Sequence, residues 1–125
     1  MIVGTGIDIV AVDRIRRLYE RHGQRALRHL LTPTEQQTLA AGGDPAARLA
    51  GRFAAKEAVM KALGTGWGEG VNFTQIEIVN DSRGAPQVRL SGNAAVHCAA
   101  SGGRRWHLSI SHCRDMAVAQ AILEA

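Results

Sequence analysis

The sequence is poor in cysteine, aromatic residues and long apolar runs, and each shortage excludes a class of protein. Cys98 and Cys113 are the only cysteines and lie in no CxxC or paired-histidine spacing, so neither a disulfide framework nor structural zinc is expected. No apolar run approaches about 18 residues, and no basic stretch precedes Asp8 at the start, so neither a membrane span nor an export signal is expected. We therefore expect a cytoplasmic protein that does not bind membranes.

The composition is that of a folded globular protein. Apolar residues make up 46% of the 125 residues and charged residues 21%, which argues against disorder. A fold of this size buries roughly two-thirds of its unfolded surface, enough for a core. No repeat or linker divides the chain, so we expect one domain over residues 1–125.

Positive charge is concentrated in one segment. Residues 13–28 hold six arginines and two acids, a surplus equal to the whole net charge of +4. Such a segment attracts an acidic partner: a nucleic acid, an anionic membrane or an acidic protein. A solvated helix face is the alternative.

The first predicted strand carries a carboxylate. Alternation predicts a strand over Ile2–Val10 with Gly4, Gly6 and Asp8 on one face. A carboxylate in an apolar strand costs free energy unless it is paired, hydrogen-bonded or bound to a cation. The glycines leave room for a ligand, so Asp8 is a candidate cation ligand. The alternative is a carboxylate near the strand end that accepts backbone or arginine hydrogen bonds.

The longest predicted helix, Ala46–Leu63, combines an acid and a lysine before a glycine-rich loop. Glu57 and Lys61 share a face, as a surface ion pair would, but the helix is rich in apolar residues and should be largely packed. Glu57 offers oxygen to Mg²⁺, Lys61 offers charge to a phosphate, and the 64–66 loop offers backbone amides. The spacing does not match GxxxxGK[ST], which disfavours a P-loop nucleotide triphosphatase.

The remaining pattern predicts an α+β fold with a largely antiparallel sheet. Thr32-Pro33-Thr34-Glu35 is a capping-box helix start, and Ser91 is expected to cap a later helix. The other expected helices cover Arg14–Arg21, Gln24–Leu31, Thr32 to near Ala41, and Ala94–Ala100. The other expected strands are Gln75–Val79, Gln87–Leu90, Trp106–Ser111 and Met116–Leu123, with residues 112–115 as a turn.

Ser111 and His112 form a third candidate site, at the end of a predicted strand and before Arg114. Together these side chains could bind a phosphate. A serine next to a histidine is weak evidence for a hydrolase triad, which is assembled in space. Cys113 is a poor candidate nucleophile for His112, because adjacent strand residues point to opposite sides.

Three segments together resemble the small 4′-phosphopantetheinyl transferases, in the holo-[acyl-carrier-protein] synthase branch. They are Gly4-x-Gly6-Ile7-Asp8-Ile9, Arg52-Phe53-Ala54-Ala55-Lys56-Glu57-Ala58 running into Lys61-Ala62-Leu63-Gly64-Thr65-Gly66, and Ser109-Ile110-Ser111-His112 with Ala117-x-Ala119. Their order and spacing match over nearly the whole chain. Cys113 departs from the threonine, aspartate or asparagine expected there, which affects only a detail of the cofactor pocket.

The resemblance implies a phosphopantetheinyl transferase fold, with a largely antiparallel sheet packed against one long helix and shorter helices. It implies transfer of 4′-phosphopantetheine from coenzyme A to a serine of apo acyl carrier protein, which supports fatty acid biosynthesis. It also implies a homotrimer with active sites between subunits, and Mg²⁺ held by Asp8 and Glu57. Lys61 would stabilise or protonate the leaving phosphate, and Glu57 or a metal-bound water would take the serine proton.

The resemblance also assigns the binding residues. Coenzyme A contacts are expected from Arg52, Lys56, Lys61, Gly64, Thr65, Gly66, Pro86, Ser111 and His112. For Arg52 and Lys56, a purely structural role is the alternative. The acidic carrier protein is expected on Arg14, Arg17, Arg21, Arg25 and Arg28.

Two other interpretations compete with the transferase. A small nucleic-acid-binding protein would use the arginine segment on phosphates, but the five aromatic residues form no stacking platform, and Asp8 and Glu57 would have no purpose. We therefore expect no nucleic-acid partner. An inactive structural subunit of the same family is the other interpretation, which loss of Asp8 or Glu57 would have favoured.

Overall fold

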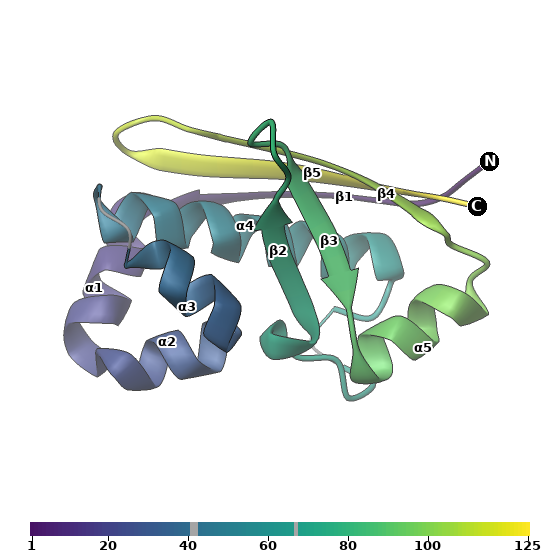
Figure 1. Cartoon of the computed structure of the whole chain (residues 1–125), viewed down its shortest axis with the longest axis horizontal. Helices are drawn as coiled ribbons and strands as arrows, with labels where there is room; N and C mark the ends of the chain where they lie inside the picture. Colours follow the sequence, from purple (N-terminus) through teal and green to yellow (C-terminus); the bar gives the residue numbers. More distant parts are fainter. Residues whose placement is uncertain (41–42, 67) are drawn as a thin grey trace.

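A three-stranded antiparallel sheet lies along one long helix (Figure 1). The structure, a computed structural model, describes residues 1–40, 43–66 and 68–125. The sheet has the order β1-β5-β4, formed by β1 (Ile2–Ala11), β4 (Arg105–His112) and β5 (Met116–Glu124). The long helix is α4 (Pro45–Leu63), which packs against all three strands.

The other elements cover the far side of α4. Three helices form a group near its N-terminal end: α1 (Val12–His22), α2 (Gln24–Leu30) and α3 (Pro33–Leu39) (Figure 1). A short turn, a two-stranded antiparallel hairpin and a helix complete the fold: η1 (Phe73–Gln75), β2 (Ile76–Asn80), β3 (Pro86–Leu90) and α5 (Gly92–Ala100). No helix in the described ranges combines the length and apolar character needed to cross a membrane.

The predicted α+β class and antiparallel pairing are confirmed, with local differences. His112 continues β4 instead of opening the turn, and the predicted helix end near Ala41 lies outside the described residues. Ser91 takes the predicted N-cap position of α5, but its side chain makes no capping hydrogen bond. Gln75 does this work from η1, its Oε1 accepting from the Ala94 amide at 3.0 Å.

Two glycines let β1 approach α4 more closely than any other residue type would. A Cβ at Gly4 would lie 2.0 Å from the carbonyl oxygen of Ala62, and one at Gly6 would lie 1.9 Å from that of Ala58. Both distances are impossible for real atoms, so the contact requires glycine. Because side chains alternate along a strand, Asp8 lies on this same face, against α4.

The helices of the described residues all lie on one side of the sheet, so none of them covers its opposite face (Figure 1). The side chains of β1 that alternate with the glycines point to this outer face. Ile7 and Ile9 are 61% and 63% exposed there. Two neighbouring exposed aliphatic side chains on one strand form a small apolar surface of the kind that is often buried against another molecule.

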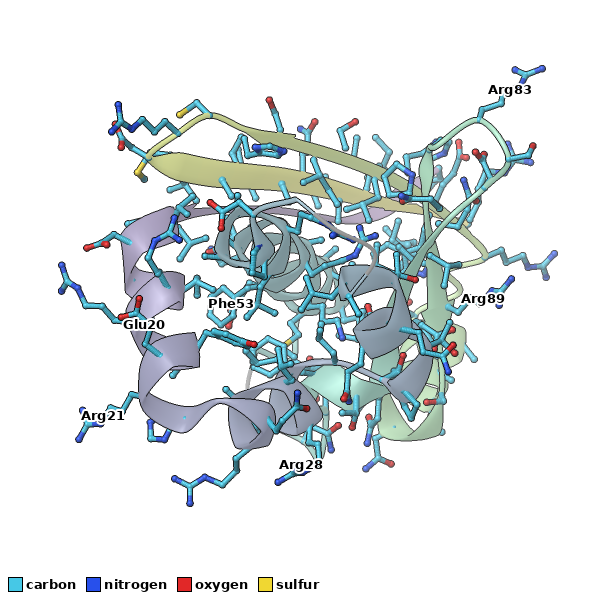
Figure 2. The ribbon with its side chains drawn as sticks, turned by 60° about the vertical axis from the view of Figure 1, so that its left-hand side comes forward. Glu20, Arg21, Arg28, Phe53, Arg83 and Arg89 are labelled. Carbon is cyan, nitrogen blue, oxygen red and sulfur yellow. The ribbon has the colours of Figure 1, made fainter. Side chains whose placement is uncertain are left out.

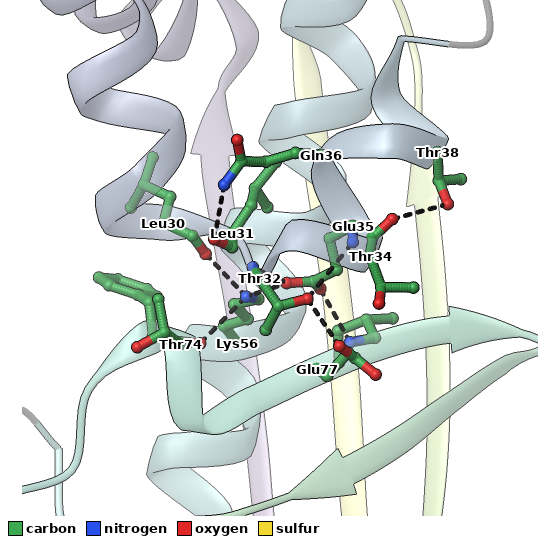
Figure 3. Close-up of polar contacts among 12 residues, drawn as sticks. Leu30, Leu31, Thr32, Thr34, Glu35, Gln36, Thr38, Lys56, Thr74 and Glu77 are labelled. Atoms are coloured by element: carbon green, nitrogen blue, oxygen red, sulfur yellow. Dashed lines mark hydrogen bonds and ion pairs between the residues drawn. The ribbon is translucent and has the colours of Figure 1, made fainter.

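A buried ion pair joins α4 to the elements beneath it (Figure 3). Lys56 Nζ lies 2.6 Å from Glu35 Oε1, and both side chains are at most 1% exposed. The ammonium also donates to the carbonyl oxygens of Leu30 at 2.7 Å and Phe73 at 3.0 Å. All three ammonium hydrogens therefore have acceptors. Burial lowers the pKa of Lys56, and the Glu35 carboxylate opposes this shift.

The Glu35 carboxylate is equally saturated. It accepts the amide of Thr32 at 2.9 Å, which confirms the predicted capping box, and the amide of Ile78 at 2.8 Å. The Thr32 hydroxyl in turn donates to Glu77 at 2.6 Å. One ion pair thus connects α2, α3, η1 and β2 to the central helix.

We expect Lys56→Met to lower the free energy of unfolding by about 3–5 kcal/mol, because the Glu35 carboxylate would be left buried without its counter-charge. Urea unfolding measures this loss. Arg17→Met, which breaks the exposed pair with Asp13, is the control and should cost less than about 1 kcal/mol. Adding Glu35→Gln to Lys56→Met should recover part of the loss. Equal, small losses in both single variants would contradict a structural role for the pair.

Candidate active site

Asp8 and Lys61 meet where β1 crosses α4. Lys61 Nζ lies 3.3 Å from Asp8 Oδ1 and donates to the carbonyl oxygen of Ile7 at 2.8 Å. The Asp8 side chain is 17% exposed, whereas that of Lys61 is 51% exposed. Gly6 makes this arrangement possible, since a Cβ there would lie 2.9 Å from Lys61 Cβ.

Glu57 completes the cluster from one turn earlier on α4. Burial raises its pKa, and the negative charge of Asp8 raises it further, while Lys61 and Arg14 lower it. The negative charges of Asp8 and Glu57 therefore repel each other across the contact between β1 and α4. The structure brings together Asp8, Glu57 and Lys61, the three residues predicted to be catalytic.

The donor set of this cluster fits Mg²⁺. Asp8 and Glu57 supply carboxylate oxygens, the type of ligand that Mg²⁺ prefers. No third histidine, cysteine or acid of the described residues joins them, so a metal bound here would take its other ligands from water or substrate. Mg²⁺ usually binds one or two carboxylates and fills its other positions with water and substrate phosphates. Two acids from facing elements meet that requirement.

A cavity of about 340 Å³ lies on the other side of α4. Its size is that of a small-molecule site. Three of the predicted coenzyme A contacts, Arg52, Pro86 and His112, line it together. The remaining lining residues are Leu31, Glu35, Thr38, Leu39, Ala47, Arg48, Gly51, Asn80, Gly84 and Ile110.

This cavity carries surplus positive charge. Burial lowers the pKa of the partly buried Arg52, and the nearby charge of Arg48 lowers it further, while Glu35 opposes the shift. Glu35 is the only acid among the described residues of the lining, and it is already paired with Lys56. An anion in the cavity would therefore be bound by two guanidinium groups.

Sequence reasoning missed Arg48. It lies four residues before Arg52, so the same helical spacing that linked Glu57 to Lys61 could have found it. The Arg48 guanidinium donates to the carbonyl oxygens of Thr38 and Leu39, the latter at 2.9 Å. These bonds fix it at the C-terminal end of α3, at the edge of the cavity.

The structure does not gather all the predicted coenzyme A contacts in one place. Arg52 and Lys61 are nine residues apart on α4, which places them on opposite faces of the helix and about 13 Å apart along its axis. Gly64, Thr65 and Gly66 follow the C-terminal end of α4, where Gly64 adopts a left-handed conformation. Ser111 is exposed on β4, whereas its neighbour His112 lines the cavity.

Lys56 differs from the other predicted contacts. Its ammonium is buried, and its three hydrogens are used by Glu35 and two backbone carbonyl groups. None remains to bind a phosphate. Of the two roles expected for Lys56, the structure therefore supports the structural one, and its assignment as a coenzyme A contact is corrected.

The arginine segment divides into paired and unpaired side chains. Arg17 is paired with Asp13 and Arg16 with Asp44, the latter at 3.0 Å. The Arg14 guanidinium lies 5.6 Å from the ring centre of Phe53. Arg25 contacts a ring nitrogen of His22. Figure 2 shows Arg21 and Arg28 projecting away from the body of the protein.

Two carboxylates and a lysine between β1 and α4, together with a cavity lined by two arginines, suit an enzyme that acts on a phosphorylated substrate. Residues 4–121 match the family model of the 4′-phosphopantetheinyl transferase superfamily. The chain belongs to this superfamily.

Several full-length relatives carry the name holo-[acyl-carrier-protein] synthase. The chain is 50% identical to a holo-[acyl-carrier-protein] synthase of Halorhodospira halophila over 98% of each protein. A crystal structure of the synthase from Neisseria meningitidis superposes with a TM-score of 0.92 at 38% identity, each chain covered completely. That of Bacillus anthracis, in complex with CoA (3′,5′-ADP), gives 0.84 at 39% identity over 100% of this chain and 98% of the other.

We expect Glu57→Gln to raise the melting temperature of the metal-free protein at neutral pH. A raised pKa means that the folded state disfavours the ionised carboxylate, so wild-type stability falls as pH rises through the folded pKa of Glu57. The gain in the variant should shrink as pH falls below the ordinary pKa of glutamate, because Glu57 then becomes protonated in both states. Melting curves at several pH values measure it, with Glu20→Gln on the exposed face of α1 as control. A lower melting temperature at neutral pH would mean that Lys61 and Arg14 outweigh burial.

Proposed function

We propose that this chain, as one domain over residues 1–125, is a cytoplasmic holo-[acyl-carrier-protein] synthase that serves fatty acid biosynthesis. It transfers 4′-phosphopantetheine from coenzyme A to a serine of apo acyl carrier protein. The observation that carries the proposal is the Asp8, Glu57 and Lys61 cluster at the contact of β1 and α4. Membership of the superfamily and the shared name of full-length relatives support it.

The reaction forms a bond between the serine Oγ and the phosphorus that carries pantetheine. The diphosphate bond to adenosine 3′,5′-bisphosphate breaks, and the serine proton goes to a base. Mg²⁺ held by Asp8 and Glu57 would neutralise the diphosphate and make the bisphosphate a better leaving group.

Lys61 acts on the leaving group, and Glu57 is a candidate for the base that acts on the attacking serine. The Lys61 ammonium, fixed by Asp8 and the Ile7 carbonyl group, stabilises or protonates the leaving phosphate. Either Glu57 or a water molecule takes the proton of the carrier serine.

Coenzyme A binds in two places. Arg52, Pro86 and His112 receive its phosphorylated adenosine in the positively charged cavity, with Arg48 at the edge. The backbone amides of Gly64, Thr65 and Gly66 contact phosphates near Lys61, and Ser111 adds a hydroxyl group. A phosphate monoester carries close to two negative charges at neutral pH and so complements the two guanidinium groups.

A homotrimer would join these two places. Arg52 and Lys61 lie on opposite faces of α4 in one chain, so a site that uses both is most simply built from two copies. The uncovered face with Ile7 and Ile9 offers an apolar surface for the neighbouring copy. A head-to-tail interface of this kind closes into a ring and repeats the active site at each junction.

The carrier protein is acidic, so it docks on the arginine segment. Arg14 is the predicted contact whose charge lowers the pKa of Glu57, which links it to the cluster. Arg21, Arg25 and Arg28 extend the surface, and none of them is paired with an acid among the described residues. Arg17 contributes least, because Asp13 neutralises it.

We expect intact-mass spectrometry to show the gain of one phosphopantetheine on an apo acyl carrier protein incubated with the chain, coenzyme A and Mg²⁺. EDTA should abolish the gain. Asp8→Ala and Glu57→Ala should reduce the rate by at least about a hundredfold while leaving the fold intact, because each removes a metal ligand. Transfer at the wild-type rate in either variant would remove the metal assignment, and no transfer by the wild type to several carrier proteins would contradict the function.

We expect Arg52→Ala and Lys61→Ala to be nearly inactive alone but to complement each other. If each site takes Arg52 from one copy and Lys61 from another, random mixing in a co-expressed oligomer leaves about a quarter of the sites intact. Transfer assays on co-purified chains with two different tags measure this. Separately purified and mixed chains that cannot exchange subunits are the control. Absence of recovered activity in verified mixed oligomers would place both residues in one chain's site.

A further inference from the structure

Glu69 holds a backbone conformation that does not suit it. It is the only non-glycine residue with a positive φ in the described part of the chain, at 61°. A side chain makes this left-handed conformation sterically unfavourable, whereas glycine adopts it freely. Glu69 therefore persists here because surrounding contacts hold it.

Those contacts come from α5, an element with no role in the proposed reaction. Nδ1 of His97 lies 3.5 Å from Glu69 Oε2, and Nε2 of the same ring lies 3.4 Å from the Glu69 carbonyl oxygen. The histidine thus meets both the side chain and the backbone of Glu69. A neutral ring donates in one of these contacts, and a protonated ring donates in both.

The next residue is held in the same way. The Gly70 carbonyl oxygen accepts from Asn93 Nδ2 at 3.2 Å and from Gln75 Nε2 at 3.1 Å. Val71 then enters the core, where it is 4% exposed. The segment from Glu69 to Val71 is therefore attached to α5, η1 and the core.

Short turns connect this attachment to the loop that follows α4. The Gly68 amide donates to the Thr65 carbonyl oxygen at 3.1 Å, and the Gly68 carbonyl accepts from the Val71 amide at 3.2 Å. A shift at residues 69–71 would therefore move the Thr65 peptide. Gly64, Thr65 and Gly66 provide the amides assigned above to the phosphates of coenzyme A.

We propose that Glu69 and His97 are positioning residues for coenzyme A binding: α5 holds the left-handed Glu69 and thereby fixes the backbone amides of residues 64–66. The inference rests on the proposed function, because it uses the assignment of that loop to the phosphates. Neither side chain touches the reacting atoms. Glycine would adopt the backbone conformation of residue 69 at a lower cost in free energy. The glutamate side chain instead provides the contact with His97.

Glu69→Gly separates a positioning role from a structural one. Glycine relieves the backbone conformation, so the melting temperature should stay equal or rise. The tie to His97 is lost, so KM for coenzyme A should rise about three- to tenfold, as expected when hydrogen bonds to phosphate weaken. The value of kcat should change little, because Asp8, Glu57 and Lys61 are untouched.

Three further variants sharpen the test. His97→Ala should raise KM for coenzyme A to the same extent as Glu69→Gly, and the double variant should add nothing. Glu69→Gln keeps an oxygen that accepts from His97 and should restore most of the affinity. Val96→Ala, at an exposed position next to His97 on α5, is the matched control and should leave KM unchanged.

Direct titration of coenzyme A by calorimetry keeps the outcomes distinct. Wild-type affinity in both Glu69→Gly and His97→Ala, with folded proteins, would overturn the positioning role while leaving the proposed function intact. If the wild type binds coenzyme A but does not transfer, the proposed function fails and weaker binding by the variants still supports the positioning role. If the wild type does not bind coenzyme A, both proposals fail.

Discussion

The buried pair of Lys56 and Glu35 is the interaction on which the arrangement of the fold depends. Isolated, either charge would be costly inside the protein, but here each polar hydrogen and oxygen has a partner from a different element. The same Glu35 lines the cavity that Arg48 and Arg52 share, and its charge acts on Arg52. The network that holds α2, α3, η1 and β2 around α4 therefore also contributes a wall residue, Glu35, and a negative charge to the candidate binding cavity.

The second constraint is the absence of side chains at Gly4 and Gly6. Without side chains at these two positions, β1 contacts the backbone of α4. This close contact places the Asp8 carboxylate beside Glu57 and Lys61. Any larger residue would push the strand outward and separate the two acids. Because Asp8 is mostly buried and carries a charge, Lys61 compensates it in the metal-free protein. The close packing and the chemistry are thus two consequences of the same pair of glycines.

Sequence reasoning found what is local or periodic and missed what depends on tertiary partners. The capping box at Thr32 and the left-handed Gly64 follow from neighbouring residues, and both were predictable. Ser91 was expected to cap α5, but Gln75 from η1 competes for that amide, which no local rule reveals. Likewise, only the fold shows that Lys56 is saturated in the interior and that Arg48 reaches the cavity.

The helix α4 explains why one short chain holds the parts of a larger site. A helix turns about 100° per residue, so side chains nine positions apart point in opposite directions. Arg52 and Arg48 face the cavity on one side, while Glu57 and Lys61 face β1 on the other. No bending of a rigid, buried helix can bring the two sets together. If coenzyme A requires both, a second copy is the simplest source of one of them, and the exposed Ile7 and Ile9 on the outer face of the sheet offer such a copy an apolar contact.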